Sequence, residues 1–92
     1  MGYNGWRNYE TWLVNLWLSN DRGTYEYMVE IAEEVKEDEY PGLRMADILK
    51  EDIEGGMPSL DGLYGDLLSS AIDAVDFDEI GKTFMEEYLR NY

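Results

Sequence analysis

Apolar residues recur along most of the chain with the three- and four-residue spacing of helices that face a core. The first such stripe consists of Tyr9, Trp12, Leu13, Leu16 and Trp17. Before it lies an irregular lead, Met1 to Arg7, followed by Asn8, a favourable helix N-cap. The stripe predicts a first helix that ends near Ser19-Asn20. Because its apolar arc is the widest, we expect this helix to be central and both tryptophans to be buried.

Two more amphipathic segments follow in the first half of the chain. Thr24 is the expected N-cap of a second helix, whose inner face would comprise Tyr25, Met28, Ile31, Ala32 and Val35. The breaker Tyr40-Pro41-Gly42 separates it from a third helix, from about Leu43 to Glu54. The inward positions of that helix would be Met45, Ile48, Leu49 and Ile53, and Gly55-Gly56 would end it.

The second half of the chain predicts two further helices. Ser59 would cap a fourth helix with the most regular stripe of the chain: Leu60, Leu63, Tyr64, Leu67, Leu68, Ala71, Ile72 and Val75. Asp76 and Glu79 have the spacing of a capping box for a fifth helix. Its core face would carry Phe77, Ile80, Phe84 and Tyr88, with Gly81 permitting close packing.

No alternating strand pattern and no internal repeat is present, so the sequence predicts one compact all-α domain of four to five short helices over residues 1–92. We expect its core to unite residues of the first, fourth and fifth helices, namely Trp12, Leu16, Leu67, Ala71 and Phe84. Hydrophobic residues make up 45% of the chain and aromatic residues 14%, which argues against disorder. No long apolar segment is present, so we expect a soluble, cytoplasmic protein with no membrane contact.

The residue types needed for common catalytic and metal-binding chemistry are missing. The chain has no cysteine and no histidine, which excludes thiolate chemistry and removes the commonest general base and metal ligand. Asp76, Asp78 and Glu79 form an acidic group, but they lack the register of a calcium loop, and helix capping explains them better. We therefore predict no enzymatic activity and no cofactor.

The net charge of −14, from 21 acidic and 7 basic residues, indicates which partners the protein can have. Bare nucleic acid and anionic membranes would repel it, whereas basic surfaces would attract it. Seven acids lie between Glu26 and Glu39, and their like-charge pairs at three- and four-residue spacing disfavour the helix by ~0.2–0.5 kcal/mol each. A binding role for these carboxylates would explain that cost.

We therefore predict a partner-binding surface formed by two acidic rows and bordering aromatic residues. The second helix would contribute Glu26, Glu30, Glu33, Glu34 and Glu37, with Asp38 and Glu39 beyond its end and with Tyr27 and Tyr40 as interface anchors. The third helix would contribute Asp47, Glu51 and Glu54. The expected partner is a basic nucleic-acid-binding protein or complex, and we expect the chain itself to be monomeric.

Both ends of the chain resemble a group of small acidic proteins of phages, plasmids and archaeal mobile elements. The resemblance is carried by "GWRNYETWLVNLWLSND", Gly5 to Asp21, and by "VDFDEIGKTFMEEY", Val75 to Tyr88, in which Gly81 replaces an alanine of the pattern. It implies an accessory protein of a mobile element. By analogy with other small acidic proteins, it suggests an inhibitor of host defence of the anti-CRISPR or anti-restriction type.

Two functional hypotheses follow from the sequence. In the first, the acidic rows imitate the charge of nucleic acid and block a basic partner. In the second, the protein is a structural or regulatory accessory protein whose acidity serves solubility alone, as in halophilic proteins. A charge-mimicking surface should be concentrated on one face, whereas a solubilising surface should be acidic all round.

Overall fold

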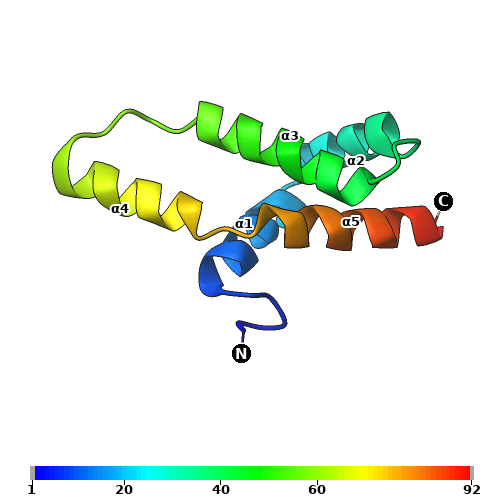
Figure 1. The fold of residues 1–92 in the computed structure, drawn as a ribbon, viewed down its shortest axis with the longest axis horizontal. Helices are drawn as coiled ribbons and strands as arrows, with labels where there is room; N and C mark the ends of the chain where they lie inside the picture. Colours follow the sequence, from blue (N-terminus) through cyan, green and yellow to red (C-terminus); the bar gives the residue numbers. More distant parts are fainter. Residues whose placement is uncertain (1, 92) are drawn as a thin grey trace.

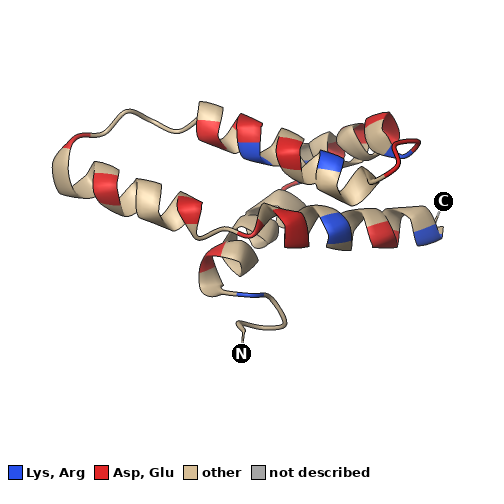
Figure 2. Ribbon diagram, in the orientation of Figure 1, with Lys and Arg blue, Asp and Glu red and all other residues tan. Residues whose placement is uncertain are grey.

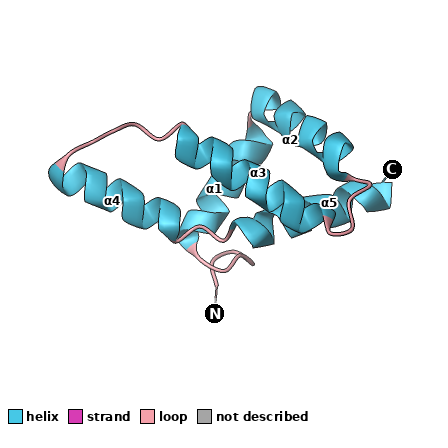
Figure 3. Ribbon diagram, turned by 45° about the horizontal axis from the view of Figure 1, so that its top comes forward, coloured by secondary structure: helices cyan, strands magenta, loops and turns pink. Residues whose placement is uncertain are grey.

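Five helices account for most of residues 2–91, the part of the chain that the computed structural model describes (Figure 1). They are α1 (Tyr9–Asn20), α2 (Arg22–Val35), α3 (Pro41–Gly55), α4 (Gly62–Asp73) and α5 (Phe77–Asn91). Within residues 2–91 no strand is present, which confirms the predicted all-α fold (Figure 3). None of these helices has the length and apolar character needed to cross a bilayer. Met1 of the predicted lead lies outside the described residues.

The core lies where α3 and α5 pack antiparallel and α2 covers them (Figure 1). Helix α3 buries Met45, Ala46 and Leu49, and α5 buries Phe77, Ile80, Met85 and Tyr88. Helix α2 adds Met28, Ile31, Ala32 and Val35, all four of them predicted to face inward. Helical spacing therefore identifies most of these buried positions, although Tyr25, predicted to face inward, is exposed, and the buried Met85 was not predicted.

Glycines bring the backbones of α3 and α5 into direct contact. A Cβ atom on Gly81 would lie 2.9 Å from the backbone nitrogen of Ala46, and it would also overlap the carbonyl oxygen of Gly42. A Cβ atom on Gly42 would in turn lie 2.8 Å from the Cα of Lys82. The predicted role of Gly81 in close packing is confirmed, and Gly42 is its counterpart on α3.

Helix α1 is peripheral, which contradicts the prediction that it is the central helix. It buries only Thr11 and Leu18, while the side chain of Trp17 is 70% exposed. Trp12 is half-buried in a small aromatic group with Tyr3 and Tyr9, at ring centroid distances of 5.0 and 5.7 Å. The apolar arc of α1 is wide because it faces this aromatic group and solvent as well as the core.

Helix α4 projects from the other helices and has no buried residue (Figures 1 and 3). Leu63, Tyr64 and Leu67 are 68%, 72% and 58% exposed. The predicted common core of Trp12, Leu16, Leu67, Ala71 and Phe84 is therefore wrong, because none of the five belongs to the buried set. Helical periodicity identified the apolar face of α4 correctly, but no element of the described chain covers that face.

The helix ends differ from the prediction in two places. Asp21, rather than Thr24, caps α2, because its Oδ1 accepts hydrogen bonds from the backbone N–H groups of Gly23 (2.8 Å) and Thr24 (3.2 Å). Helix α4 begins after Asp61 rather than after Ser59. Asn8 caps α1 as predicted, and its Oδ1 accepts a hydrogen bond from the N–H of Thr11.

The N-terminal lead contains a tight turn. Tyr3 and Trp6 exchange two backbone hydrogen bonds, and the two residues between them, Asn4 and Gly5, have φ values of 48° and 88°. Positive φ at both positions is typical of the Asn-Gly turns that join antiparallel chains. The turn places Trp6 against the hydrophobic core.

Candidate functional site

The predicted acidic row of α2 is exposed to solvent. Its members are Glu26, Glu30, Glu33, Glu34, Glu37, Asp38 and Glu39, and every one of these side chains is accessible. Helix α2 ends at Val35, so the last three lie in the connection to α3 rather than on the helix. The rigid part of the row is therefore shorter than predicted and consists of the four glutamates from Glu26 to Glu34.

Basic side chains neutralise only part of this row. Arg22 pairs with Glu26 at 3.1 Å, Lys36 pairs with Glu33 at 3.0 Å, and Arg44 approaches Asp38 at 4.0 Å. All three pairs are solvent-exposed, and such pairs contribute little to stability. Within the described residues, four acids of the row form no ion pair: Glu30, Glu34, Glu37 and Glu39.

Helix α3 contributes the second acidic row beside the first. Asp47, Glu51 and Glu54 are exposed, and none of them forms an ion pair within the described residues. Helices α2 and α3 pack against each other, and Figure 2 shows acidic residues on the outer sides of both. From Glu26 to Glu54 the sequence has eleven acids and three basic residues. With Arg22 at the start of α2 included, α2, α3 and their connection carry eleven acids and four basic residues, a net charge of −7 and thus half of the total.

The rest of the molecule is also acidic, although less densely. The other ten acids and three of the other four basic residues are distributed over α1, α4, α5 and the loops, and the fourth, Arg22, begins α2 (Figure 2). The charge is therefore concentrated on α2 and α3 without being confined to them.

Tyr27 joins the two acidic helices. Its ring packs against the core, and its hydroxyl donates a hydrogen bond to a carboxylate oxygen of Asp52 on α3. Burial raises the pKa of the Tyr27 hydroxyl well above its usual range, and the hydrogen bond to Asp52 and the negative charge of that carboxylate raise it further. The hydroxyl is therefore already engaged within the protein, and Tyr27 fixes the two rows relative to each other.

Replacing Tyr27 with Phe should lower the free energy of unfolding by about 1 kcal/mol at pH 8, the usual net value of a hydrogen bond. Because the folded pKa is raised, this contribution is complete below the unfolded pKa of about 10 and declines as the pH rises above it. The stability difference between wild type and Tyr27→Phe should thus shrink as the pH rises above about 10. Urea unfolding followed by circular dichroism would measure it, and a difference independent of pH would contradict the assigned bond.

Tyr40 lies at the end of the acidic row beside an apolar groove. The groove has a volume of about 470 Å³ and lies between the start of α3 and the second half of α5. It is lined by Tyr40, Leu43, Lys82, Met85 and Leu89 among others. Tyr40 is largely exposed, so its side chain is accessible to a partner, unlike the hydroxyl of Tyr27.

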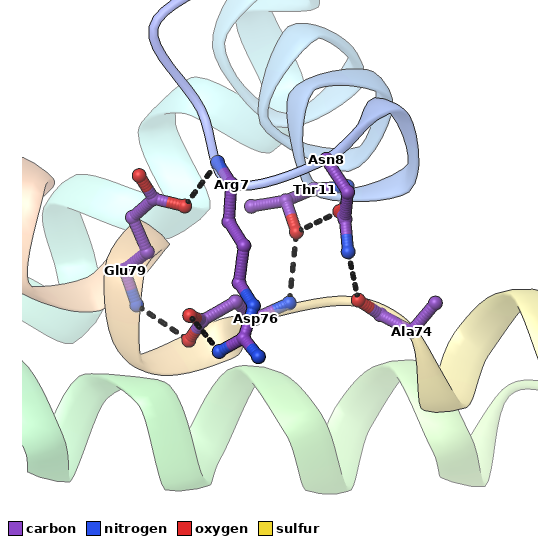
Figure 4. A network of polar contacts seen from close by, with 6 residues as sticks. All are labelled: Arg7, Asn8, Thr11, Ala74, Asp76 and Glu79. Atoms are coloured by element: carbon purple, nitrogen blue, oxygen red, sulfur yellow. Dashed lines mark hydrogen bonds and ion pairs between the residues drawn. The ribbon is translucent and has the colours of Figure 1, made fainter. Parts of the chain in front are cut away.

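A polar network fastens the start of α1 to the start of α5 (Figure 4). At its centre is Thr11, which is fully buried. The Thr11 hydroxyl donates to Oδ1 of Asn8 (2.6 Å) and accepts a hydrogen bond from the backbone N–H of Asp76 (2.9 Å). Asn8 Nδ2 donates in turn to the carbonyl of Ala74 (2.7 Å). Sequence periodicity gives no sign of this network, because it depends on one buried threonine.

Arg7 and Glu79 complete the network. A carboxylate oxygen of Glu79 accepts a hydrogen bond from the backbone N–H of Arg7 (2.9 Å), and the Arg7 guanidinium approaches Asp76 at 3.4 Å. Asp76 accepts from the N–H of Glu79 (3.1 Å), as a capping box requires. In a capping box the N–H of Asp76 would donate to the side chain of Glu79. Here that N–H donates to the Thr11 hydroxyl instead. The two segments that carry the sequence resemblance therefore meet in the fold and have a structural role.

The described residues contain no group of three or more acidic side chains placed to hold a metal ion. Asp76 and Glu79 are engaged in the network just described, and Asp78 is exposed on the first turn of α5. The surface features available for function are therefore the acidic rows, the groove beside Tyr40 and the exposed apolar face of α4.

Comparison with known proteins identifies a family and no characterised relative. A model of a family of unknown function, DUF7249, matches residues 1–90. No curated protein and no solved structure matches the chain. Since the match spans nearly the whole sequence, including both segments joined by the Thr11 network, the chain belongs to the DUF7249 family.

Proposed function

We propose that the protein is a non-enzymatic inhibitor that binds a basic nucleic-acid-handling protein, with the carboxylates of α2 and α3 occupying the positions of phosphates. The single observation that supports this most strongly is a set of exposed acids on the two adjacent helices that form no ion pair with any residue between 2 and 91: Glu30, Glu34, Asp47, Glu51 and Glu54. These carboxylates are available to lysine and arginine side chains of a partner. The resemblance to mobile-element proteins suggests a host-defence component as that partner.

The rigidity of the two rows favours this function. Carboxylates four residues apart on a helix project from one side at a spacing of ~5–6 Å between Cβ atoms. Tyr27 and Asp52 connect the helices, so both rows keep a fixed relation. A partner can then exchange phosphates for carboxylates without ordering a flexible chain, and ordering a chain would weaken binding.

The solubility hypothesis keeps one observation in its favour. Acidic residues also cover α4 and α5, outside the proposed binding surface (Figure 2). Under this second hypothesis the protein is a structural or regulatory accessory protein of a mobile element, and no single acidic row matters more than another. Charge reversal at two separate places distinguishes the two functions.

The test compares Glu30→Lys plus Glu34→Lys on α2 with Glu86→Lys plus Glu87→Lys on α5. Each pair changes the net charge equally, and all four side chains are exposed. Proteins captured from a lysate of the source cell by the wild type should be released by rising salt and by added DNA or RNA, because screening and competition act on the same charges. The captured protein is then purified and its association rate with each variant is measured. Charge reversal on α2 should lower this rate about tenfold or more, since steering charges act chiefly on association.

The α5 reversal should have a much smaller effect on that association. Equal losses from both reversals would show that the acidity acts diffusely and would support the solubility hypothesis. A captured protein that does not bind nucleic acid, or that DNA and RNA cannot displace, would contradict charge mimicry. Circular dichroism of both variants checks that the fold is retained.

A further inference from the structure

The apolar face in the first half of α4, together with Leu60 just before the helix, is exposed and lacks a partner within the described chain. Its exposed residues are Leu60, Leu63, Tyr64 and Leu67, whereas Gly65, Leu68, Ala71 and Ile72 are partly covered. The covered apolar residues lie mainly in the second half of α4, whereas the exposed ones lie in its first half, toward the end that is farther from α5. On a helix of 3.6 residues per turn, Leu63, Leu67 and Tyr64 lie on one side as a continuous strip, and Leu60 just precedes it.

The size of this strip is that of a binding surface for a single helix. With large side chains exposing ~150–250 Å² each when free, the four exposed residues present on the order of 400–500 Å² of surface. That is as large as the largest apolar patch of an ordinary monomer, which is often functional. Leu60, Leu63, Tyr64 and Leu67 have the i, i+3, i+4 and i+7 spacing of the anchors by which an amphipathic helix packs against an apolar surface.

Charge around the strip defines the chemistry of the partner. Helix α4 has Asp66 and Asp73 along one edge of the strip, seven residues apart, and Asp61 directly precedes the helix. The segment from Asp61 to Asp73 contains no lysine or arginine (Figure 2). A partner helix bordered by basic residues would pair with these aspartates, whereas an acidic border would be repelled.

A second copy of the same chain fits this face less well. Two copies joined through α4 would bury on the order of 1,000 Å² in total, which is near the lower limit for a specific interface. They would also bring together two acidic edges and two chains of net charge −14. The charge therefore favours a different protein with the opposite charge.

We infer that the exposed face of α4 binds an amphipathic helix of another protein, whose apolar stripe is bordered by lysine or arginine. This surface is separate from the acidic rows of α2 and α3, so the inference does not depend on the proposed charge mimicry. Leu63, Tyr64 and Leu67 would form the apolar contact, and Asp66 and Asp73 would set the charge preference.

The probe is a fluorescent synthetic peptide of leucine and lysine at helical spacing, ~18 residues and thus ~27 Å long as a helix, enough to cover α4. A matched peptide carries glutamate in place of lysine. Fluorescence anisotropy measures binding to the full chain. The lysine peptide should bind at least about tenfold more tightly than the glutamate peptide. Comparable binding of the two, or no binding of the lysine peptide, would overturn the inference.

Variants locate the binding face. Leu63→Ser plus Leu67→Ser should weaken binding of the lysine peptide about tenfold or more, because two apolar anchors are lost. The control Leu43→Ser plus Leu89→Ser, which alters two exposed leucines of the groove beside Tyr40, should change binding by less than about twofold, as expected of residues outside an interface. Equal effects of the two pairs would overturn the inference.

A second set of variants separates this face from the acidic rows. Asp66→Asn plus Asp73→Asn should weaken binding of the lysine peptide, whereas Glu30→Gln plus Glu34→Gln should leave its affinity nearly unchanged. The reverse order would place the peptide on α2 and overturn the inference without affecting the proposed function. Sedimentation velocity should show a monomer. A dimer that dissociates in Leu63→Ser plus Leu67→Ser would identify a second copy as the occupant and would also overturn it.

Discussion

Replacing Leu49 with Ala should lower the free energy of unfolding by about 2–5 kcal/mol, whereas the same change at Leu67 should alter it by less than about 0.5 kcal/mol. Leu49 is fully buried on α3 and belongs to the core cluster that also contains residues of α5 and α2. Its truncation removes apolar burial and leaves a cavity. Leu67 is 58% exposed on α4, and alanine is the better helix former.

Urea unfolding of both variants by circular dichroism would measure this contrast. A domain of this size has a total stability on the order of 5–10 kcal/mol, so Leu49→Ala should be close to unfolding at body temperature. The comparison is informative because the sequence alone favours α4 as a packed helix. If Leu67→Ala were as destabilising as Leu49→Ala, α4 would have to be packed in solution, and both its exposure and the inferred binding face would be wrong.

Replacing Gly81 with Val should destabilise the protein by about 1–3 kcal/mol or more, although glycine is a poor helix former. The first side-chain carbon would already lie within 3 Å of the backbone of Ala46 and closer still to the carbonyl of Gly42. Backbone atoms of a packed helix cannot move aside as the end of a flexible side chain can. Helix α3 would therefore have to separate from α5 and lose part of the core contact.

The control for this substitution is Gly55→Ala at the end of α3, where an added Cβ would meet no atom within 4 Å. This change should be neutral or stabilise the protein by up to about 1 kcal/mol, because alanine reduces the entropy of the unfolded chain. Thermal unfolding should show a lower melting temperature for Gly81→Val and an unchanged or higher one for Gly55→Ala. A stabilising effect of Gly81→Val would show that α3 and α5 are not in backbone contact.

The sequence predicts a helix correctly wherever its apolar stripe meets another stripe. Met28, Met45 and Ile80 are buried as their spacing indicates, because α2, α3 and α5 cover one another. Trp17 and Leu63 occupy equally regular positions and are exposed. Helical spacing shows which side of a helix is apolar, and it carries no information about whether a neighbouring element covers that side.

The candidate acidic residues are predictable in part for a similar reason. Exposure of Glu30 and Glu34 follows from their place opposite the apolar stripe, and the pairing of Arg22 with Glu26 follows from the four-residue spacing. The hydrogen bond from Tyr27 to Asp52 depends on how α2 meets α3, so no local pattern indicates it. The turn at Asn4-Gly5 did have a local signal, since that dipeptide is the commonest one in such turns.

The position of α4 between α3 and α5 has a consequence for how sequences with this fold can vary. Residues 57–73 leave the core after α3 and return before the buried Val75, so they form one large closed loop. The entropy of closing such a loop grows only with the logarithm of its length, by ~0.6 kcal/mol per doubling. Insertions, deletions or a different helix in this segment would therefore cost the core little. Selection could adapt this segment to new partners while Gly42, Gly81 and Thr11 remain fixed.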